Sequence, residues 1–497
     1  MAQKKRRKGK KKQPTAALPA ANSISSRYRF FLWMCGFFAL ATIFLRLDVI
    51  TVWPGAEGEA LNAALNSDRT GFYLPVWIND QLSQISELFY LGPRLLSAAF
   101  LIATAMLFYH WGRRLFGLTA TRLTLIAAAA SIWLPFFGKV ATADSWALLG
   151  HTGLFLSGLL LQRDGRKQYG YFYLLFAVFS ALAAPLSTLI FLIGAGLFAY
   201  RAKAAKPVLE MAGAAIGLAT TVLLLSKPDN GITYYFLGDL EVATYGRFLF
   251  FGFLGVLPQV GWWLAGQRDW FFRWKKQDEL ARSLFPFLVV ALLSQSLLLM
   301  LLWSLLSAKQ LQHYFADNYP WKSWVRAGAV LHLIFAFFAA FLGLMAGLAA
   351  FRGDGYRAAL GMVAAYWIFS LLAVIGLYGN RRDFAIGGTA LAGILLSLFF
   401  WTQVYPYLET QRNWPQQVLE ATEAQAGDTY FIDYSQGHKS TIATALPYFT
   451  HQGLRKSDVP NSAEHQLLVR PIENRDTLVQ ENQIFGRIVV RGVVVEY

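Results

Sequence analysis

The chain of 497 residues is 56% hydrophobic and only 15% charged, a composition that excludes an ordinary water-soluble globular protein. A large part of its net charge of +16 lies in residues 4–12, which are all Lys or Arg apart from Gly9. No predicted fold accompanies this tail, so RNA binding is a weaker interpretation than a cytoplasmic tail that orients a membrane protein. A single cysteine, Cys35, excludes an intrachain disulfide and a cysteine-based metal site.

Residues 1–28 are predicted to form a disordered basic tail on the cytoplasmic side of a membrane. The apolar segment that follows, residues 30–50, is long, and no small-residue cleavage site comes after it, which argues against a removable signal peptide. The tail is expected to fix the orientation of this first span and to contact anionic membrane lipids.

Long apolar runs recur through residues 29–402, and each is long enough to cross about 30 Å of hydrocarbon as a helix. They predict an all-α polytopic membrane protein. The basic loops at residues 113–122 and 163–167 are placed in the cytoplasm by the positive-inside rule. The apolar stretch 171–200 is broken at Ala184-Pro185, which predicts two short spans.

The sequence predicts about 12 or 13 spans, and hydropathy does not decide between them. Single spans at 284–306, 326–350, 357–378 and 384–402 would place Arg381-Arg382 outside and the C-terminus in the cytoplasm. One crossing hidden near 307–330, or one false crossing, reverses the side of the C-terminus.

Residues 403–497 differ from the rest of the chain because they carry mixed charge and contain no spanning run. The segment 413–425 is predicted as a helix and the segment 428–434 as a strand. Two valine-rich runs near the C-terminus, within 488–495, predict a closing strand or hairpin. We therefore expect a small soluble α/β domain.

The chemistry is expected at the external loop 51–92, which follows the first span. Its six charged residues cannot lie in hydrocarbon, so the loop lies at one face of the membrane. Glu57 and Glu59 stand just beyond a membrane helix, and the aromatic and proline-containing segment Tyr73–Trp77 follows them. This arrangement predicts a polar site at the membrane interface.

Three further candidates lie at or near external turns. Asp144 begins the fourth span, where a carboxylate can take part in chemistry or simply cap the helix. Arg94 begins the second span and is suited to holding a phosphate. His151 lies two turns beyond Asp144 and is a candidate substrate ligand, although a histidine hydrogen-bonded between helices is the more common case.

No phosphate-binding loop, dinucleotide fingerprint, zinc-protease motif or nucleophile elbow stands in a suitable context. No cofactor and no metal site are therefore expected, and dependence on a divalent metal stays open.

Several short segments together resemble a known family. They are, in order, an acidic external loop, Gly92-Pro93-Arg94-Leu95, Arg114-Leu115-Phe116-Gly117, Thr142-x-Asp144-Ser145 and Lys309-x3-His313-Tyr314-x4-Tyr319-Pro320. Over nearly the whole chain, this order resembles the GT-C polyprenyl-phosphate-sugar transferases of family 39. That family includes protein O-mannosyltransferases and lipid A aminoarabinose transferases.

The resemblance implies inverting transfer of a sugar from a polyprenyl phosphate to a lipid, glycan or protein acceptor on the external face. An acid in the first loop acts as general base, and nearby cations stabilise the departing phosphate. Glu57 matches the second acid of the family's Asp-Glu-x-x-Tyr motif, Glu59 is the alternative base, and Asp144 matches a later Asp. Later in the chain, Lys309, His313 and Tyr314 match the motif that is expected near the lipid phosphate.

The sequence also departs from the family pattern. The first Asp and the Tyr of the acidic motif are absent from Ala56–Ala60, and the lysine of the family's Lys-Pro-Pro-Leu is absent from Leu74–Trp77. The base therefore stays open between Glu57 and Glu59. The family pattern implies a bacterial inner-membrane protein with thirteen spans and a periplasmic C-terminal domain.

Two other classes of function compete with the transferase. A transporter or flippase for a lipid-linked substrate is disfavoured because no internal repeat is present and the polar residues gather at one face rather than at the midplane. A non-catalytic membrane scaffold would use the basic tail and the C-terminal domain for partners. Convergence of the three candidate acids on one external cavity would weaken the scaffold hypothesis.

Overall fold

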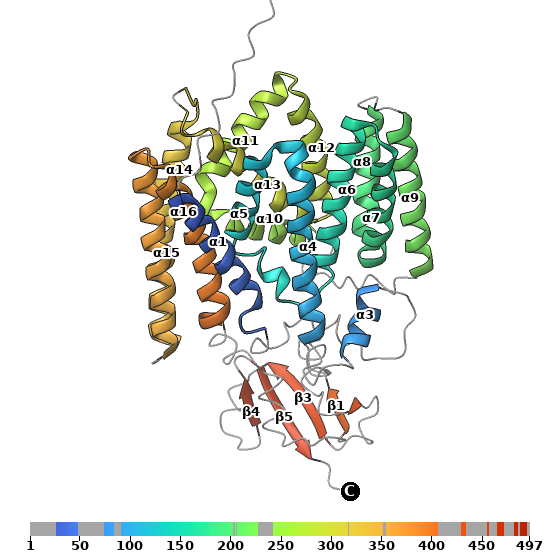
Figure 1. Cartoon of the computed structure of the whole chain (residues 1–497). Coiled ribbons are helices and arrows are strands. Elements are labelled where there is room, and N and C mark those ends of the chain that lie inside the picture. The colour runs from blue at the N-terminus through green and yellow to red at the C-terminus, as the bar shows by residue number, and fades with distance from the viewer. Residues whose placement is uncertain are drawn as a thin grey trace, which may run out of the picture.

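The computed structural model describes residues 26–47, 74–83, 91–201, 204, 206–226, 242–316, 318–350 and 354–405, and five strand segments between 429 and 494. The predicted basic tail, the segment with Glu57 and Glu59, and the predicted helix over 413–425 lie outside these residues. The described part is a body of helices with a five-stranded sheet beyond one end of it (Figure 1).

The helices run mostly along one common direction (Figure 1). They are α1 (Ser26–Phe44), α3 (Leu74–Ser83), α4 (Leu91–Phe116), α5 (Leu118–Ala129), α6 (Asp144–Asp164), α7 (Lys167–Ala183), α8 (Pro185–Arg201), α9 (Lys206–Ser226), α10 (Val242–Gly255), α11 (Val260–Lys275), α12 (Glu279–Leu293), α13 (Leu298–His313), α14 (Lys322–Ala350), α15 (Asp354–Tyr378) and α16 (Arg382–Phe399). The one-turn helices η1 (Phe136–Gly138) and η2 (Leu257–Gln259) precede α6 and α11, and η3 (Phe400–Val404) extends α16.

The predicted break at Ala184-Pro185 is present, and Pro185 is the first residue of α8. Proline suits this position because its missing N–H would have no partner within the helix and its fixed φ is already helical. The helices on either side, α7 and α8, have 17 residues each, so each is about 25 Å long. They match the two short apolar segments that the sequence predicted, and they form a hairpin.

The predicted single span over 284–306 is wrong. Two helices, α12 and α13, occupy this stretch, with a break at residues 294–297. Gln295 has a left-handed φ of 50°, and the Ser296 hydroxyl accepts a hydrogen bond from the backbone N–H of Leu298 at 3.2 Å. The hidden crossing therefore lies here and not near 307–330.

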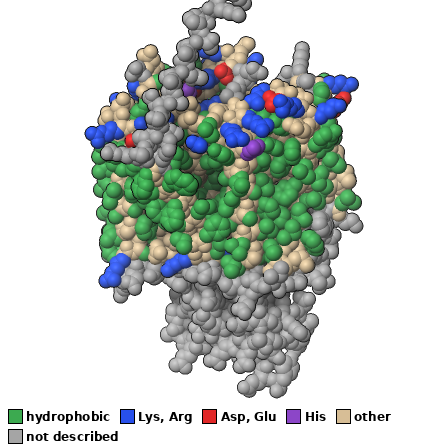
Figure 2. Space-filling view, in the orientation of Figure 1, with side chains coloured by type: hydrophobic (Ala, Val, Ile, Leu, Met, Phe, Trp, Pro, Cys, Tyr) green, Lys and Arg blue, Asp and Glu red, His purple; other side chains and the backbone are tan. Residues whose placement is uncertain are grey.

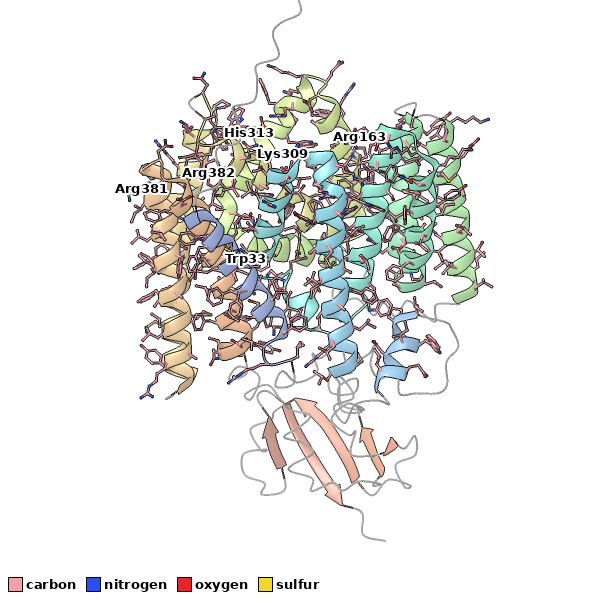
Figure 3. The ribbon with its side chains drawn as sticks, in the orientation of Figure 1. Trp33, Arg163, Lys309, His313, Arg381 and Arg382 are labelled. Carbon is pink, nitrogen blue, oxygen red and sulfur yellow. The ribbon has the colours of Figure 1, made fainter. Side chains whose placement is uncertain are left out.

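The additional crossing changes the side of two later arginines. Arg381 and Arg382 lie at the same end of the body as Arg163, not at the opposite end as predicted (Figure 3). Helix α3 has only 10 residues, about 15 Å, and is too short to cross. With α3 left out, and with α10 and α11 taken as one bent leg, the described helices form thirteen legs. Because the legs alternate in direction, α1 begins at one end of the body and α16 finishes at the other, beside the sheet (Figure 1).

Length and composition agree with a protein that crosses the membrane many times. Four described helices, within 91–116, 206–225, 356–378 and 382–404, are long and apolar enough to cross alone, and the bent pair 248–275 makes a fifth. Shorter apolar helices lie among them. Hydrophobic side chains form a broad belt on the outer face, with Lys and Arg gathered at the end that carries Arg163 (Figures 2 and 3).

Small residues allow the helices to approach closely. A Cβ atom on Gly261 of α11 would lie 2.5 Å from the carbonyl oxygen of Val325 in α14, and one on Gly393 of α16 would lie 2.0 Å from that of Ala130. Lipid tails provide no hydrophobic driving force for helix association, so close van der Waals contact of this kind stabilises the bundle.

A buried polar cluster joins the two helix breaks. His151 of α6 is fully buried, its Nδ1 lies 2.7 Å from the Ser296 hydroxyl, and its Nε2 lies 3.3 Å from the Thr188 hydroxyl. The Thr188 hydroxyl also lies 2.7 Å from that of Ser180. Ser187 donates to the Ser294 carbonyl at 2.7 Å. This cluster ties the α7–α8 and α12–α13 hairpins to α6.

The sheet beyond the helices has the strand order β2-β1-β3-β5-β4. Strand β1 (Thr429–Asp433) falls in the predicted segment 428–434 and pairs in parallel with β2 (Arg455–Lys456) and β3 (His465–Pro471). The valine-rich end forms one strand, β5 (Ile488–Val494), antiparallel to β3 and β4 (Asn482–Phe485). The α/β character of the C-terminal domain stays a prediction, because its expected helix lies outside the described residues.

Replacing Thr188 by valine should lower the free energy of unfolding by about 1–2 kcal/mol more than replacing Thr124 by valine. Both threonines are fully buried, but the Thr124 hydroxyl bonds only to the carbonyl of Ala120 in its own helix. Thermal unfolding of the purified protein in detergent measures the difference. Equal losses in both variants would show that the cluster around His151 does not hold the hairpins.

The thirteen-leg arrangement predicts which positions share a side of the membrane. In a chain with Cys35 replaced by alanine, single cysteines at Arg163, Arg382 and Lys206 should react alike with a membrane-impermeant maleimide. A cysteine at Gln81 of α3 should show the opposite pattern, in intact cells compared with inverted vesicles. Reaction of the Arg382 cysteine together with the Gln81 cysteine would contradict the assignment of α12 and α13 as two crossings.

Candidate functional site

The turn that ends α1 is held by three cationic side chains. Arg94 of α4 donates from Nη1 to the Leu47 carbonyl at 2.8 Å, and Lys139 donates from Nζ to the Leu45 carbonyl at 2.7 Å. Arg46, with a left-handed φ of 57°, donates to the Thr402 carbonyl at 2.8 Å. These contacts fix the point at which the chain leaves the bundle and enters the loop that carries Glu57 and Glu59.

The cations suit this position for a general reason. The last carbonyl groups of a helix have no partner within the helix, and the helix dipole makes this end partly negative. The carbonyls that follow the helix end therefore lack a partner within the helix and are shielded from water. Arg94 and Lys139 supply the hydrogen-bond donors that they need. Both side chains are buried, with 0% and 1% of their surface exposed.

Arg94 and Lys139 are neighbours. They bond to carbonyls two residues apart, and two residues of chain span at most about 7 Å. Burial and, secondly, the nearby charge of Arg94 lower the pKa of Lys139, in the connection between α5 and α6, to about 7. Two buried cations so close together form a region that favours an anion.

Asp144 lies at the same end of the bundle, five residues beyond Lys139. It opens the first turn of α6 and has only 4% of its surface exposed. The hydroxyls of Thr142 and Ser145 on either side of it, and that of Ser97 one turn beyond Arg94, are buried without a hydrogen-bond partner among the described residues. Buried polar atoms of this kind call for an explanation such as a bound polar group.

Helix α3, the first described element after the segment with Glu57 and Glu59, packs at this end. Leu74 and Ile78 of α3 contact a buried cluster that includes Trp146 of α6. Phe100 of α4 lies against Trp146 with ring centroids 4.2 Å apart. Glu57 and Glu59 lie outside the described residues, but both described flanks of their segment, Leu47 and Leu74, are anchored at this end.

The structure does not bring the late motif to this site. Lys309 and His313 lie at the end of the bundle that carries Arg163, remote from the first turn of α6 (Figures 1 and 3). Tyr314 is buried there: its hydroxyl donates to the Leu377 carbonyl and accepts from Arg326 Nε, both at 3.1 Å. The structure therefore separates these residues from Asp144, because α13 returns to the end from which α12 starts. Their role near a lipid phosphate stays a prediction.

His151 also has a position that favours the packing interpretation over the substrate-binding one. Its ring is fully buried, stacks on Phe191 with centroids 4.8 Å apart, and has a hydroxyl within hydrogen-bond distance of each nitrogen. Those contacts belong to the cluster that joins the helix breaks.

Sequence reasoning missed Lys139 and Arg46. A signal for Lys139 was available, since a lone lysine between Phe136-Phe137-Gly138 and Val140-Ala141 is expensive to bury without an anionic or carbonyl partner. Arg46, at the end of the first span, has no comparable signal because interfacial arginines are common. Within the described residues, no group of three His, Cys, Asp or Glu side chains is placed to hold a metal ion.

Comparison with solved structures shows the fold. The chain superimposes on ArnT from Cupriavidus metallidurans bound to undecaprenyl phosphate with a TM-score of 0.62 at 11% identity, over 93% of this chain and 98% of that one. The apo form of the same protein gives 0.59 at 12% identity, over 93% and 97%. An oligosaccharyltransferase from Archaeoglobus fulgidus gives only 0.35 at 12% identity, over 87% and 63%, and carries no argument. No protein-family model and no curated protein matches the sequence.

These similarities confirm the prediction of a GT-C fold in a polytopic, mainly helical membrane protein. At 11–12% identity they do not extend to activity. The groups able to take part in chemistry are the cations and the carboxylate assembled where α1, α4 and α6 meet.

Proposed function

We propose that this protein is an inverting glycosyltransferase that moves a sugar from a polyprenyl-phosphate donor to a lipid, glycan or protein acceptor. The observation that carries the proposal is the pair of buried cations, Arg94 and Lys139, at the same membrane end as the buried carboxylate of Asp144. This arrangement occurs in a fold whose solved relative holds undecaprenyl phosphate.

The proposed reaction uses each charge for one task. A carboxylate, from Glu57, Glu59 or Asp144, takes the proton of the acceptor hydroxyl as its oxygen bonds to the anomeric carbon. The bond between that carbon and the phosphate oxygen breaks, and the polyprenyl phosphate leaves with the electron pair. Arg94 and Lys139 stabilise the charge on the departing phosphate, in surroundings where water does not weaken the interaction.

We further propose the orientation and division of the chain. The end with Arg163, Arg381 and Arg382 faces the cytoplasm, because basic residues gather there (Figure 2). Asp144 and the C-terminal sheet then lie on the external side of a bacterial inner membrane. Residues 29–402 form the catalytic membrane domain, and residues 403–497 form a separate soluble domain. The proposed chemistry needs no cofactor.

Asp144→Asn should lower the rate of sugar transfer at least about 100-fold if its carboxylate is the base, as removal of a general base typically does. The matched control is Asp383→Asn, because Asp383 also stands in the first turn of a helix but at the opposite end. The measurement is transfer of radiolabelled sugar from polyprenyl-phosphate donors by purified protein in liposomes. Full activity of Asp144→Asn would move the base to the external loop, where Glu57→Gln and Glu59→Gln test it.

The same assay separates the transferase from its alternatives. If the wild type transfers no sugar from any polyprenyl-phosphate donor, the proposed function is overturned and the scaffold hypothesis stands. If it moves a fluorescent lipid-linked sugar between leaflets without transferring it, the protein is a flippase. Transfer that is lost only in the carboxylate variants supports the proposal.

Binding of polyprenyl phosphate should weaken as the pH rises. Lys139 has a pKa lowered to about 7, so it is charged at pH 6 and neutral at pH 9 before a ligand binds. A bound phosphate favours the charged lysine, so above the lowered pKa the affinity should fall by up to about tenfold per pH unit. Titrating binding from pH 6 to pH 9 measures this slope.

Lys139→Arg is the control, since an arginine keeps its charge throughout this range. Its affinity should vary little with pH. A slope as steep in Lys139→Arg as in the wild type would assign the pH dependence to another group.

A further inference from the structure

A cavity lies at the end of the bundle remote from Asp144. Its volume is about 620 Å³, and helices α6, α7, α8 and α9 line one side while α11 and α12 line the other. Leu161 of α6 is part of its wall and is 17 residues from Asp144, so the two sites are about 25 Å apart along the helix. The cavity is therefore separate from the candidate transfer site.

Apolar and aromatic side chains form most of the cavity wall. Leu161 and Tyr173 are buried lining residues. Phe285 of α12 contacts Phe198 of α8 across the cavity with ring centroids 6.0 Å apart, and Trp274 of α11 lies 5.5 Å from Phe285. Such a wall suits hydrocarbon and not a small hydrophilic solute.

Two arginines stand at the rim, one on each side. Arg201 is the last residue of α8 and Arg282 lies in the first turn of α12, and both are exposed. Among the described residues, neither forms an ion pair, and no carboxylate lines the cavity. Other arginines at this end do pair: Arg163 lies 2.7 Å from Asp164, and Arg273 lies 3.0 Å from Asp269.

The cavity is deeper than a simple anion would fill, and it can take the upper part of an acyl chain. From Arg201 down to Ala195 the wall extends six residues, about 9 Å, and from Arg282 down to Phe287 it extends five residues, about 7.5 Å. An inorganic phosphate would contact only the rim and would leave the apolar floor unfilled. An anionic head group at the rim with an acyl chain beneath it uses both parts.

We propose that this cavity binds an anionic glycerophospholipid from the leaflet at the Arg163 end of the protein. The phosphate lies between the guanidinium groups of Arg201 and Arg282, which are suited to planar, bidentate contact with phosphate oxygens. The acyl chain lies against Phe198, Phe285 and Tyr173. This site does not depend on the proposed transferase activity.

The test measures lipid binding to the delipidated, full-length protein by native mass spectrometry. Phosphatidylglycerol and phosphatidylcholine with identical acyl chains are the probes, and water-soluble glycerol phosphate is the third. The wild type should bind phosphatidylglycerol at least tenfold more tightly than phosphatidylcholine and should not retain glycerol phosphate. The double variant Arg201→Gln/Arg282→Gln should lose the preference between the two lipids.

The control is Arg166→Gln/Arg381→Gln, which removes the same charge from the same end but outside the cavity lining. It should keep the wild-type preference. A third variant, Ala195→Phe, places a bulky ring in the cavity and leaves both arginines in place, and it should weaken phosphatidylglycerol binding as well.

Four results would overturn the proposal. Retention of the lipid preference by Arg201→Gln/Arg282→Gln would show that the cavity arginines are dispensable. An equal loss in the control would indicate a diffuse surface charge. Wild-type binding by Ala195→Phe, or binding of glycerol phosphate as tight as that of the lipid, would exclude an acyl chain in the cavity.

Discussion

Backbone groups freed where helices stop inside the bundle are the constraint on which the rest of this structure depends. Hydrocarbon provides no water to bond them, so each break needs side chains that do. At the end of α1 the partners are Arg94 and Lys139. At the α12–α13 break, Ser187 and Ser296 take that role, and His151 joins the latter to α6.

The two kinds of partner have different consequences. Neutral hydroxyls around His151 satisfy the backbone and one another, and they leave no net charge in the bundle. The cations at the end of α1 satisfy carbonyls and also bring positive charge into a place that excludes water. The first solution produces only packing, whereas the second produces a region able to hold an anion. The same structural need thus accounts for both the scaffold and the candidate site.

The sequence predicts most of the membrane architecture, because spans are set by length and hydropathy. The α7–α8 break follows from Pro185, and strand β1 follows from the apolar pattern of 428–434. The sequence carries no local signal for the α12–α13 break, because no Pro or Gly lies within residues 293–297. The serines there mark a break only through the hydrogen bonds that they form once the helices pack. Because this break was not predicted, Arg381 and Arg382 were assigned to the wrong end of the bundle.

Only part of the candidate site can be predicted from the sequence. Asp144 and Arg94 stood at predicted helix starts, and the structure places both at one end of the bundle. Lys309 and His313 matched a family motif by spacing, yet spacing along the chain says nothing of the membrane side once a crossing is miscounted. Lys139 matters through its distance from Arg94, and a contact between residues 45 positions apart depends on the packing of α4 against η1 and α6.

The short hairpin α7–α8 affects the bilayer itself. Each of its helices is about 25 Å long, whereas the hydrocarbon layer is about 30 Å thick, and side chains such as Leu175 and Leu197 expose 60% of their surface to it. At 17 residues these two helices are at the lower limit for a span, whereas α15, with 25 residues, is at the upper limit. Different spanning lengths on the two sides are the structural condition for hydrophobic mismatch, so we expect the protein to prefer a thinner bilayer beside α7 and α8 than beside α15.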